Sequence, residues 1–239
     1  MPKENKIAII GLGYVGLPLA IAFSKFYKVI GFDLDPDRVN ELNDSFDSNA
    51  DISFEINENI KFTDKEKDLL EADIYIITVP TPVTSKNIPD LSILERATKT
   101  VATYLRKGDI VIYESTVYPG VTEDICVPIL EKLSGFKYNT DFYCGYSPER
   151  ISPGTEKYSL ENVVKVTSGS TLEVADDIDR MYQKIIKAGT YKAPSIKVAE
   201  AAKVVENTQR DVNIALMNEL SMMFDKMNID TSEVLEAAK

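Results

Sequence analysis

A lysine, an asparagine and an arginine near the end of the chain are spaced to share one face of a helix. Lys203, Asn207 and Arg210 lie in a stretch without Pro or Gly, and helical positions three or four residues apart are neighbours. A Lys ammonium beside a neutral amide, both fixed on a rigid helix, is suited to hold an alkoxide or oxyanion. Arg210 can also lower the pKa of Lys203, so that the lysine acts as a base. A solvated polar face has the same pattern, and the spacing does not separate these alternatives.

The other side of the same predicted helix is apolar. One helical pattern runs from Ile196 to about Asn228, and Asp230-Thr-Ser-Glu is typical of a cap that opens a further helix before Lys239. At roughly 100° per residue, one side collects Val205, Val212, Leu216, Leu220, Met223 and Met227. This stripe is longer and richer in Met than one small domain needs to cover, so we expect the helix to build a homodimer.

Three glycines follow a short apolar run close to the N-terminus. In "KIAIIGLGYVGLPLA" they occupy positions Gly11, Gly13 and Gly16. The first permits a tight turn, the second lets a pyrophosphate approach the backbone, and the third lets helix and strand pack closely. The helix that follows would offer N–H groups and a partial positive charge to phosphates. A tight turn in a non-binding α/β protein is the alternative.

A carboxylate in the segment "GFDLD" favours the binding interpretation. Asp33 ends the second predicted strand, where an acidic side chain holds both ribose hydroxyls of a dinucleotide. Because a 2′-phosphate would be repelled there, the acid favours NAD over NADP. Arg38 either lies over the adenine or is a solvated helix residue, and its spacing leaves both open.

Hydroxyl side chains follow two further predicted strands, in "TVPTP" (Thr78–Pro82) and "ESTVYPG" (Glu114–Gly120). Ligands of open parallel sheets bind at the carboxyl ends of the strands. Thr81, Ser115 and Thr116 are therefore expected on the ligand side, where they can bond the cofactor or place a water. Ordinary capping of the next helix is the alternative.

A third such segment, "YSPERISPG", carries adjacent charges between prolines. Glu149 and Arg150 in this segment can serve a substrate, and a surface turn is the alternative.

The elements that position these residues alternate between strand and helix. Strands are predicted at Lys6–Ile10, Lys28–Asp33, Ile74–Val79, Ile110–Glu114, Phe142–Tyr146 and Val163–Thr167. Helices are predicted at Val15–Lys25, Asp37–Asn43, Leu91–Leu105 and Val121–Leu133, with an irregular loop at Asn43–Asn59. This alternation predicts an α/β fold, a Rossmann-type doubly wound parallel sheet followed by a long central helix. The expected domains are residues 1–194 and 195–239.

Composition narrows the chemistry further. The 239 residues carry a formal charge of −11, which disfavours nucleic acid as a partner. No apolar run has the length of a membrane span and no signal peptide is visible, so we expect a cytoplasmic protein without a membrane partner. Histidine is absent, which excludes His-based triads and His-ligated metals, and no metal site is expected. Cys126 and Cys144 have the surroundings of buried, unreactive thiols.

Six segments together resemble the nucleotide-sugar dehydrogenase family, here the UDP-glucose/GDP-mannose dehydrogenases. They are "GLGYVGLPLA", "GFDLD", "VPTP", "ESTVYPGVTED", "SPERISPG" and "AEAAKVVENTQRDVNIALMNE". The resemblance runs from Ile7 to the C-terminus. "SPER" followed by "PG" is most similar to the branch that acts on UDP-N-acetylhexosamines in bacterial capsule and O-antigen synthesis.

The resemblance implies an enzyme that oxidises the C6 alcohol of a UDP-sugar to a carboxylate by successive hydride transfers to NAD⁺. It implies that Lys203 and Asn207 hold the C6 oxygen, and that Glu149 and Thr116 position water or relay protons. Substrate binding falls to Arg150, Ile151, Lys203, Asn207 and Arg210. The implied NAD site comprises Gly11, Gly13, Tyr14, Val15, Gly16, Asp33, Arg38, Pro80, Thr81, Ser115 and Thr116.

One feature of the family has no counterpart in this sequence. The family's catalytic cysteine lies in a Gly-x-Cys loop that opens a UDP-binding domain, and the chain stops at Lys239, before such a loop. Cys126 and Cys144 match neither its position nor its context. We therefore expect a cofactor-binding fragment without the C-terminal UDP-binding domain, inactive alone.

Two other function classes fit parts of the pattern. The β-hydroxyacid dehydrogenases also join a dinucleotide-binding domain to helices with a Lys-x-x-x-Asn, although "VPTP" and "SPERISPG" argue against them. A non-catalytic NAD(H)-binding or dimerisation module is the other alternative.

Overall fold

The computed structural model describes residues 5–49, 52–150 and 160–238. The chain divides into two compact units, Met1–Ala201 and Ala202–Lys239. Ile151, a predicted substrate contact, lies outside the described residues.

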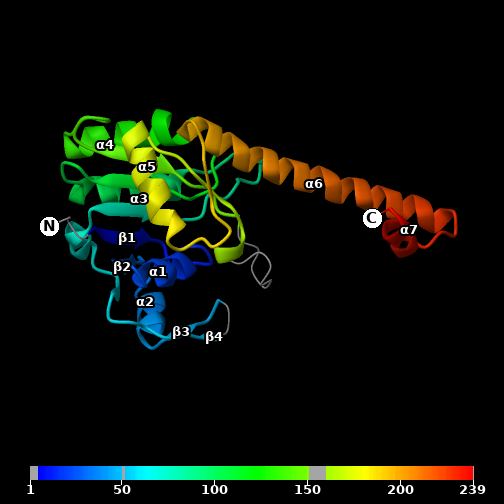
Figure 1. The fold of residues 1–239 in the computed structure, drawn as a ribbon, viewed down its shortest axis with the longest axis horizontal. Helices are drawn as coiled ribbons and strands as arrows, with labels where there is room; N and C mark the ends of the chain where they lie inside the picture. The colour runs from blue at the N-terminus through cyan, green and yellow to red at the C-terminus, as the bar shows by residue number, and fades with distance from the viewer. Residues whose placement is uncertain (1–4, 50–51, 151–159, 239) are drawn as a thin grey trace. The chain divides into compact units, whose positions relative to one another are not determined.

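The first unit is built on a parallel sheet of six described strands (Figure 1). These are β1 (Lys6–Ile10), β2 (Lys28–Phe32), β5 (Ile60–Thr63), β6 (Ile74–Ile77), β7 (Ile110–Tyr113) and β8 (Tyr143–Tyr146). Their order is β5-β2-β1-β6-β7-β8, so the chain winds outward in both directions from the β1–β6 pair. This is the predicted doubly wound fold, and it makes the carboxyl ends of β1 and β6 the switch point where such sheets bind ligands.

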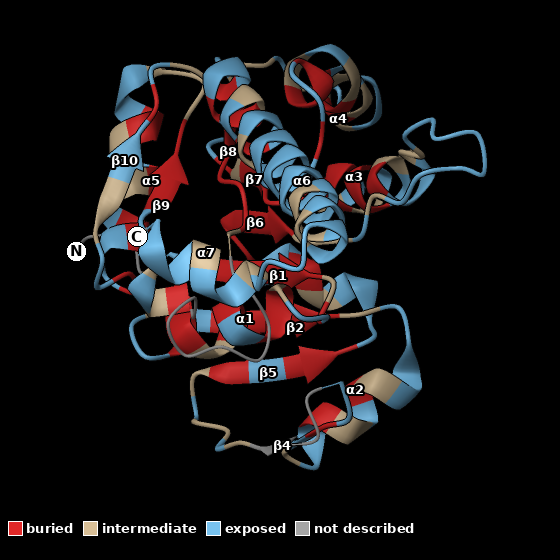
Figure 2. Ribbon diagram, turned by 90° about the vertical axis from the view of Figure 1, so that its right-hand side faces the viewer, coloured by how far each residue is buried: buried red, intermediate tan, exposed pale blue. Residues whose placement is uncertain are grey.

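Helices cover both faces of this sheet because its strands alternate their side chains between two cores. On β1, Ile7 and Ile9 pack with α1 (Gly16–Ser24), α2 (Pro36–Asn43) and α5 (Leu172–Gln183). Ala8 and Ile10 face the other core, with α3 (Ser92–Tyr104) and α4 (Val127–Ser134). Figure 2 shows β1, β6 and β7 buried between these layers.

Some elements differ from the sequence predictions. The strand predicted at Val163–Thr167 is β9 (Lys165–Thr167), which pairs with β10 (Thr190–Lys192) in a separate two-stranded sheet. The helix predicted from Val121 begins as a π-helical segment, η2 (Val121–Cys126), before α4. The loop predicted at Asn43–Asn59 contains a short antiparallel pair, β3 (Phe46–Asp47) and β4 (Ile52–Ser53). The predictions missed β5, β10, α5 and the short helices η1 (Glu66–Glu71) and η4 (Leu160–Asn162).

The long helix α6 (Ile196–Lys226) begins in the first unit and continues through the second. The second unit ends with α7 (Thr231–Ala237), where the Asp230 carboxylate accepts hydrogen bonds from the N–H groups of Ser232 and Glu233. The long helix predicted from Ile196 and the helix cap predicted at Asp230 are both confirmed.

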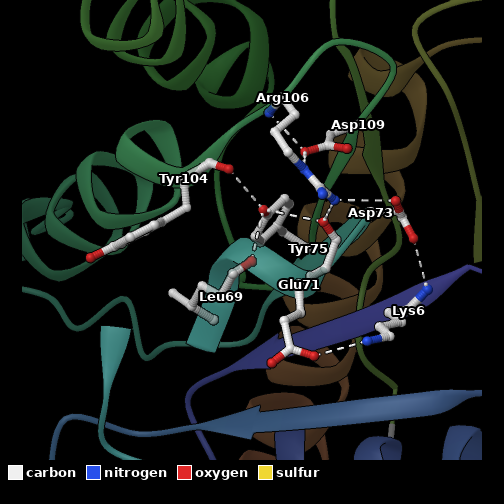
Figure 3. A network of polar contacts seen from close by, with 9 residues as sticks. Lys6, Leu69, Glu71, Asp73, Tyr75, Tyr104, Arg106 and Asp109 are labelled. Carbon is white, nitrogen blue, oxygen red and sulfur yellow. Dashed lines mark hydrogen bonds and ion pairs between the residues drawn. The ribbon is translucent and has the colours of Figure 1, made fainter. Parts of the chain in front are cut away.

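Polar contacts join the amino ends of β1, β6 and β7 (Figure 3). The buried Tyr75 hydroxyl lies within hydrogen-bond distance of carbonyls that include those of Leu69 (3.0 Å) and Tyr104 (3.1 Å). Asp73 accepts from the Lys6 N–H (3.1 Å) and pairs with Arg106 (3.2 Å). This network lies at the amino ends of the strands, opposite the glycine loop, whereas the switch point lies at their carboxyl ends.

Glu200 anchors the first turns of α6 to the loop after β7. Its carboxylate is fully buried and accepts from the N–H groups of Gly120 (2.6 Å) and Thr122 (3.0 Å). Both donors lie at the start of η2, where no side chain of that segment caps the helix. Glu200 therefore acts as the cap from a distant part of the sequence.

We expect Glu200→Gln to destabilise the first unit, because an amide presents an NH₂ group where one of two buried N–H groups needs an acceptor. The loss should be about 1–3 kcal/mol, measured as a shift in the denaturant midpoint of unfolding. Glu95→Gln is the matched control, since Glu95 pairs with Lys99 one turn further along α3, and both side chains are partly exposed. It should cost less than about 1 kcal/mol. Equal effects of the two changes would contradict a capping role.

Candidate functional site

The glycine loop between β1 and α1 is closely packed. Gly11 has a positive φ of 94°, and its carbonyl accepts from the Thr78 hydroxyl at 2.7 Å. A Cβ on Gly16 would lie 1.9 Å from that same carbonyl oxygen, so only glycine fits there. A Cβ on Gly13 would meet nothing within 4 Å. The exposed side of Gly13 is therefore open to a ligand, as a pyrophosphate requires.

The start of α1 is free to accept an anion. Its first turn holds no acidic side chain, and Val15 at the N-cap makes no side-chain hydrogen bond to it. Tyr14 is 57% exposed beside it. N–H groups and the positive end of the helix dipole are thus presented at the switch point.

Asp33 supports the glycine loop in addition to facing the ligand edge. Its Oδ2 accepts from the Leu12 N–H at 2.8 Å and its Oδ1 accepts from the Asp35 N–H at 3.1 Å. Each carboxylate oxygen has a second lone pair, so both remain able to accept from ribose hydroxyls. Binding of the ribose by Asp33 stays a prediction. The structure also shows that Asp33 holds the backbone of the glycine loop, a role that was not predicted from the sequence.

Arg38 clamps the loop from α2. Its guanidinium donates to the Leu12 carbonyl at 3.0 and 2.9 Å and pairs with Asp47 at 2.7 Å. It also pairs with Glu41, and its side chain is only 10% exposed. A contact with adenine stays a prediction, because the described bonds of Arg38 hold the loop itself.

A cleft of about 190 Å³ opens next to the glycine loop and Asp33. Its walls are mostly apolar, which suits a flat aromatic base. The lining residues are Ile10, Gly11, Phe32, Asp33, Leu34, Val79, Pro80, Ile93, Arg96, Ala97 and Thr100. Gly11, Asp33 and Pro80 were predicted from the sequence, whereas the α3 residues of the cleft were not. Ile93, Ala97 and Thr100 have the spacing of one helix face. This spacing is the feature of the sequence that could have indicated their shared position.

Hydroxyl groups tie the loops after β6 and β7 together. The Thr81 hydroxyl donates to the Thr116 carbonyl and the Ser115 hydroxyl to the Val79 carbonyl, each at 2.6 Å. The structure thus brings these three predicted residues together. Each hydroxyl oxygen keeps acceptor capacity, so cofactor and water contacts stay predictions.

Glu149, after β8, belongs to a buried ionic cluster. The Lys165 ammonium on β9 contacts Glu149 Oε2 at 3.0 Å and Glu114 Oε2 at 2.6 Å. The Tyr182 hydroxyl on α5 donates to the other oxygen of Glu114. Roles for Lys165, Glu114 and Tyr182 were not predicted, although a lysine within the apolar run "VVKVT" is a visible signal.

Burial governs the protonation of this cluster. It raises the pKa of Glu114 to about 7, against the opposing effect of Lys165. Burial alone would lower the pKa of Lys165, but Glu114 and Glu149 more than offset it, and the lysine pKa is raised. Lys165 therefore remains charged at neutral pH.

The remaining predicted site residues lie in the loop after β8 and on α6. Arg150 Nη1 donates to the Val164 carbonyl at 3.3 Å. Lys203, Asn207 and Arg210 all lie on α6 in the second unit, where Arg210 pairs with Glu206 at 2.7 Å. The shared helix is confirmed, whereas the catalytic and binding roles stay predictions.

The two thiols are buried, as predicted. Cys126 and Cys144 are 0% exposed. Burial raises the pKa of Cys126 to about 11 and that of Cys144 well above its usual value. Neither thiol forms thiolate at neutral pH. Within the described ranges, no acidic, Cys or His group is assembled for a metal, and no helix is long and apolar enough to cross a bilayer.

Comparison with known families gives matches along almost the whole chain. Residues 5–186 match the NAD binding domain of the UDP-glucose/GDP-mannose dehydrogenase family, and residues 197–239 match its central domain. The NAD-binding domain of that family is therefore present, with NAD as its cofactor.

Curated relatives carry the names of UDP-sugar dehydrogenases. A UDP-N-acetyl-D-glucosamine 6-dehydrogenase of Salmonella typhi is 58% identical over 98% of this chain and 56% of its own length. One from Pseudomonas aeruginosa is 54% identical over 99% of this chain and 57% of its own length. The chain thus spans somewhat more than half the length of these relatives.

Solved structures agree with this fold. A UDP-D-ManNAc dehydrogenase from Pyrococcus horikoshii aligns with a TM-score of 0.88 at 34% identity, over 98% of this chain and 57% of its own. The UDP-N-acetyl-mannosamine dehydrogenase Cap5O from Staphylococcus aureus aligns with a TM-score of 0.81 at 31% identity, covering 98% and 58%.

Two glycine substitutions should separate packing from ligand binding. Gly16→Ala places a methyl group against the Gly11 carbonyl, so it should destabilise the protein by about 1–3 kcal/mol or more. Gly13→Ala meets no protein atom, so its stability should change by less than about 0.5 kcal/mol, while NAD⁺ affinity falls about tenfold or more. Denaturant unfolding and calorimetric titration measure the two effects. Unchanged NAD⁺ affinity of the Gly13 variant would contradict the placement of the pyrophosphate.

Proposed function

Because this chain belongs to the UDP-glucose/GDP-mannose dehydrogenase family, we propose that it is the cofactor-binding and central-helix part of a UDP-N-acetylhexosamine 6-dehydrogenase. The observation that carries this proposal is the combined match of both family domains over residues 5–186 and 197–239. The names of the relatives support a UDP-N-acetylhexosamine as substrate. The product would be the corresponding uronate, for bacterial surface polysaccharides such as capsule or O-antigen, made in the cytoplasm.

The proposed cofactor site follows the geometry of the switch point. The N–H groups at the start of α1 bind the pyrophosphate, and the open side of Gly13 lets it approach. Asp33 accepts from the ribose hydroxyls, and the cleft of about 190 Å³ beside it receives the adenine. Tyr14, Thr81 and Thr116 line the same edge.

The proposed chemistry removes a hydride from C6 of the sugar. NAD⁺, when bound, accepts this hydride. Lys203 and Asn207 stabilise the C6 oxygen as negative charge develops, while Glu149 and Thr116 orient the water or move its proton. Arg150, Ile151 and Arg210 contribute to binding of the nucleotide sugar.

The second oxidation needs a group that this chain does not offer. Oxidation of an alcohol to an acid passes through an aldehyde, and a thiolate can retain it as a covalent adduct. Cys126 and Cys144 are buried and have raised pKa values. We therefore expect residues 1–239 to bind NAD⁺ without turning over a UDP-sugar.

The homodimer is also part of the proposal. Large apolar side chains of α6 are exposed, among them Val212 (59%), Leu216 (51%) and Met223 (45%). A second copy of the chain would cover this stripe and remove it from water.

Cofactor selectivity tests Asp33. Calorimetric titration should give tighter binding of NAD⁺ than of NADP⁺, because the Asp33 carboxylate repels a 2′-phosphate. Asp33→Asn should weaken NAD⁺ by about 1–3 kcal/mol and narrow the difference between the two cofactors. Asp35→Asn is the matched control, since Asp35 caps α2 through the Asp37 N–H and should leave selectivity unchanged. Equal affinities for both cofactors in the unmodified chain would refute the assignment.

Turnover tests the reaction. The full-length product of the gene should form NADH from UDP-N-acetylglucosamine or a related UDP-N-acetylhexosamine, whereas residues 1–239 should form none. Lys203→Ala in the full-length protein should lower kcat by about 100-fold or more, as loss of a group that stabilises an oxyanion does. Steady NADH formation by residues 1–239 alone would overturn the requirement for a further thiol. Oxidation of 3-hydroxyisobutyrate instead of any UDP-sugar would favour a β-hydroxyacid dehydrogenase.

Sedimentation tests the dimer. The unmodified chain should sediment as a dimer at micromolar concentration, and Leu216→Glu should shift it to monomer by placing a charge in the apolar stripe. Asn218→Glu adds the same charge on the other side of α6 and should leave the dimer intact. A monomeric unmodified chain, or equal effects of the two variants, would argue against this surface.

A further inference from the structure

The ionic cluster around Lys165 is deeply buried, so its charges need close partners. Lys165 is 3% exposed and Glu114 is 2% exposed, yet both are charged or ionisable groups inside the first unit. Burying an ammonium costs several kcal/mol unless partners surround it. Lys165 has three such partners, the carboxylates of Glu114 and Glu149 and the Pro148 carbonyl at 3.2 Å. The site therefore holds these groups in one arrangement.

The arrangement that it fixes is the side chain of Glu149. One carboxylate oxygen, Oε2, accepts from the Lys165 ammonium at 3.0 Å. The other, Oε1, accepts from the N–H of Arg150 at 2.6 Å. These two donors, one on each oxygen, help to define the plane of the carboxylate. The side chain is 11% exposed, so it is held at the border between interior and ligand edge.

Glu114 and Tyr182 hold the lysine in turn. Tyr182 donates to Glu114 Oε1, and Glu114 Oε2 accepts from Lys165, so the chain of contacts runs from α5 through β7 and β9 to the loop after β8. The Lys165 ammonium also lies 5.5 Å from the centre of the Tyr182 ring. Burial raises the pKa of Glu114 to about 7, and Glu114 and Glu149 both raise the pKa of Lys165. The Lys165 ammonium therefore bridges the two carboxylates.

We propose that Lys165 is a positioning residue, which holds the Glu149 carboxylate ionised and in one orientation for the water or proton step of the reaction. This inference rests on the proposed function only for the identity of that step. Glu149 is the group that would touch water or substrate, and Lys165 acts through it. Loss of Lys165 should make the Glu149 carboxylate easier to protonate, because the nearest cation is gone.

The experiment compares two variants of the 239-residue chain. Glu114→Gln removes one carboxylate and keeps the contact between Lys165 and Glu149. Lys165→Met combined with Glu114→Gln removes the cation as well, without leaving two unpaired carboxylates in the interior. Carboxyl carbon NMR follows the titration of Glu149, with Glu149→Gln identifying its signal. The Glu149 midpoint should lie about one pH unit or more higher in the double variant than in Glu114→Gln.

The same variants in the full-length protein connect the titration to turnover. The acidic limb of the kcat–pH profile should lie at higher pH in the double variant than in Glu114→Gln, with the KM for NAD⁺ nearly equal in the two variants. Equal Glu149 midpoints in the two variants would overturn the proposal, as would identical pH profiles. If the midpoint shifts but the unmodified full-length protein oxidises no UDP-sugar, the control of Glu149 by Lys165 stands and the proposed reaction fails.

Discussion

The approach of α1 to the end of β1 is the constraint on which the site depends. Because position 16 has no side chain, the helix begins against the Gly11 carbonyl, and its first N–H groups open onto the switch point of the sheet. Asp33 and Arg38 both bind the backbone of Leu12 within this loop. The residues that shape this turn therefore also shape the ligand edge. The contacts that pack the loop are the same contacts that position the proposed binding groups.

The polar side chains at the two edges of the sheet have different kinds of partner. At the amino edge, Asp73 pairs with Arg106, and the Tyr75 hydroxyl bonds a nearby carbonyl. At the carboxyl edge, the hydroxyls of Thr81 and Ser115 join neighbouring loops but retain acceptor capacity. Hydrogen bonds from these hydroxyls to backbone carbonyls hold the loops in place. The hydroxyl oxygens can still accept a hydrogen bond from a ligand, as a preorganised binding site requires.

The sequence predicted the fold well where patterns are local. The glycine spacing, five of the six described strands of the main sheet and the length of α6 are visible in consecutive residues, and all of these appear in the structure. It predicted less where pairing is distant. β9 has strand character, but its partner β10 follows an intervening helix, and nothing local tells a strand which sheet it joins. Lys165 was missed for the same reason, since its carboxylate partners lie 51 and 16 residues away.

The contact made by Glu200 has a consequence for how the chain acquires its structure. The acceptor of the Gly120 N–H lies 80 residues further along the chain, and closing so long a loop is an entropic cost that only the finished segment can repay. The turn at Gly120 and Thr122 therefore has its buried acceptor only after the chain has been made as far as Glu200, later than every described strand of the main sheet.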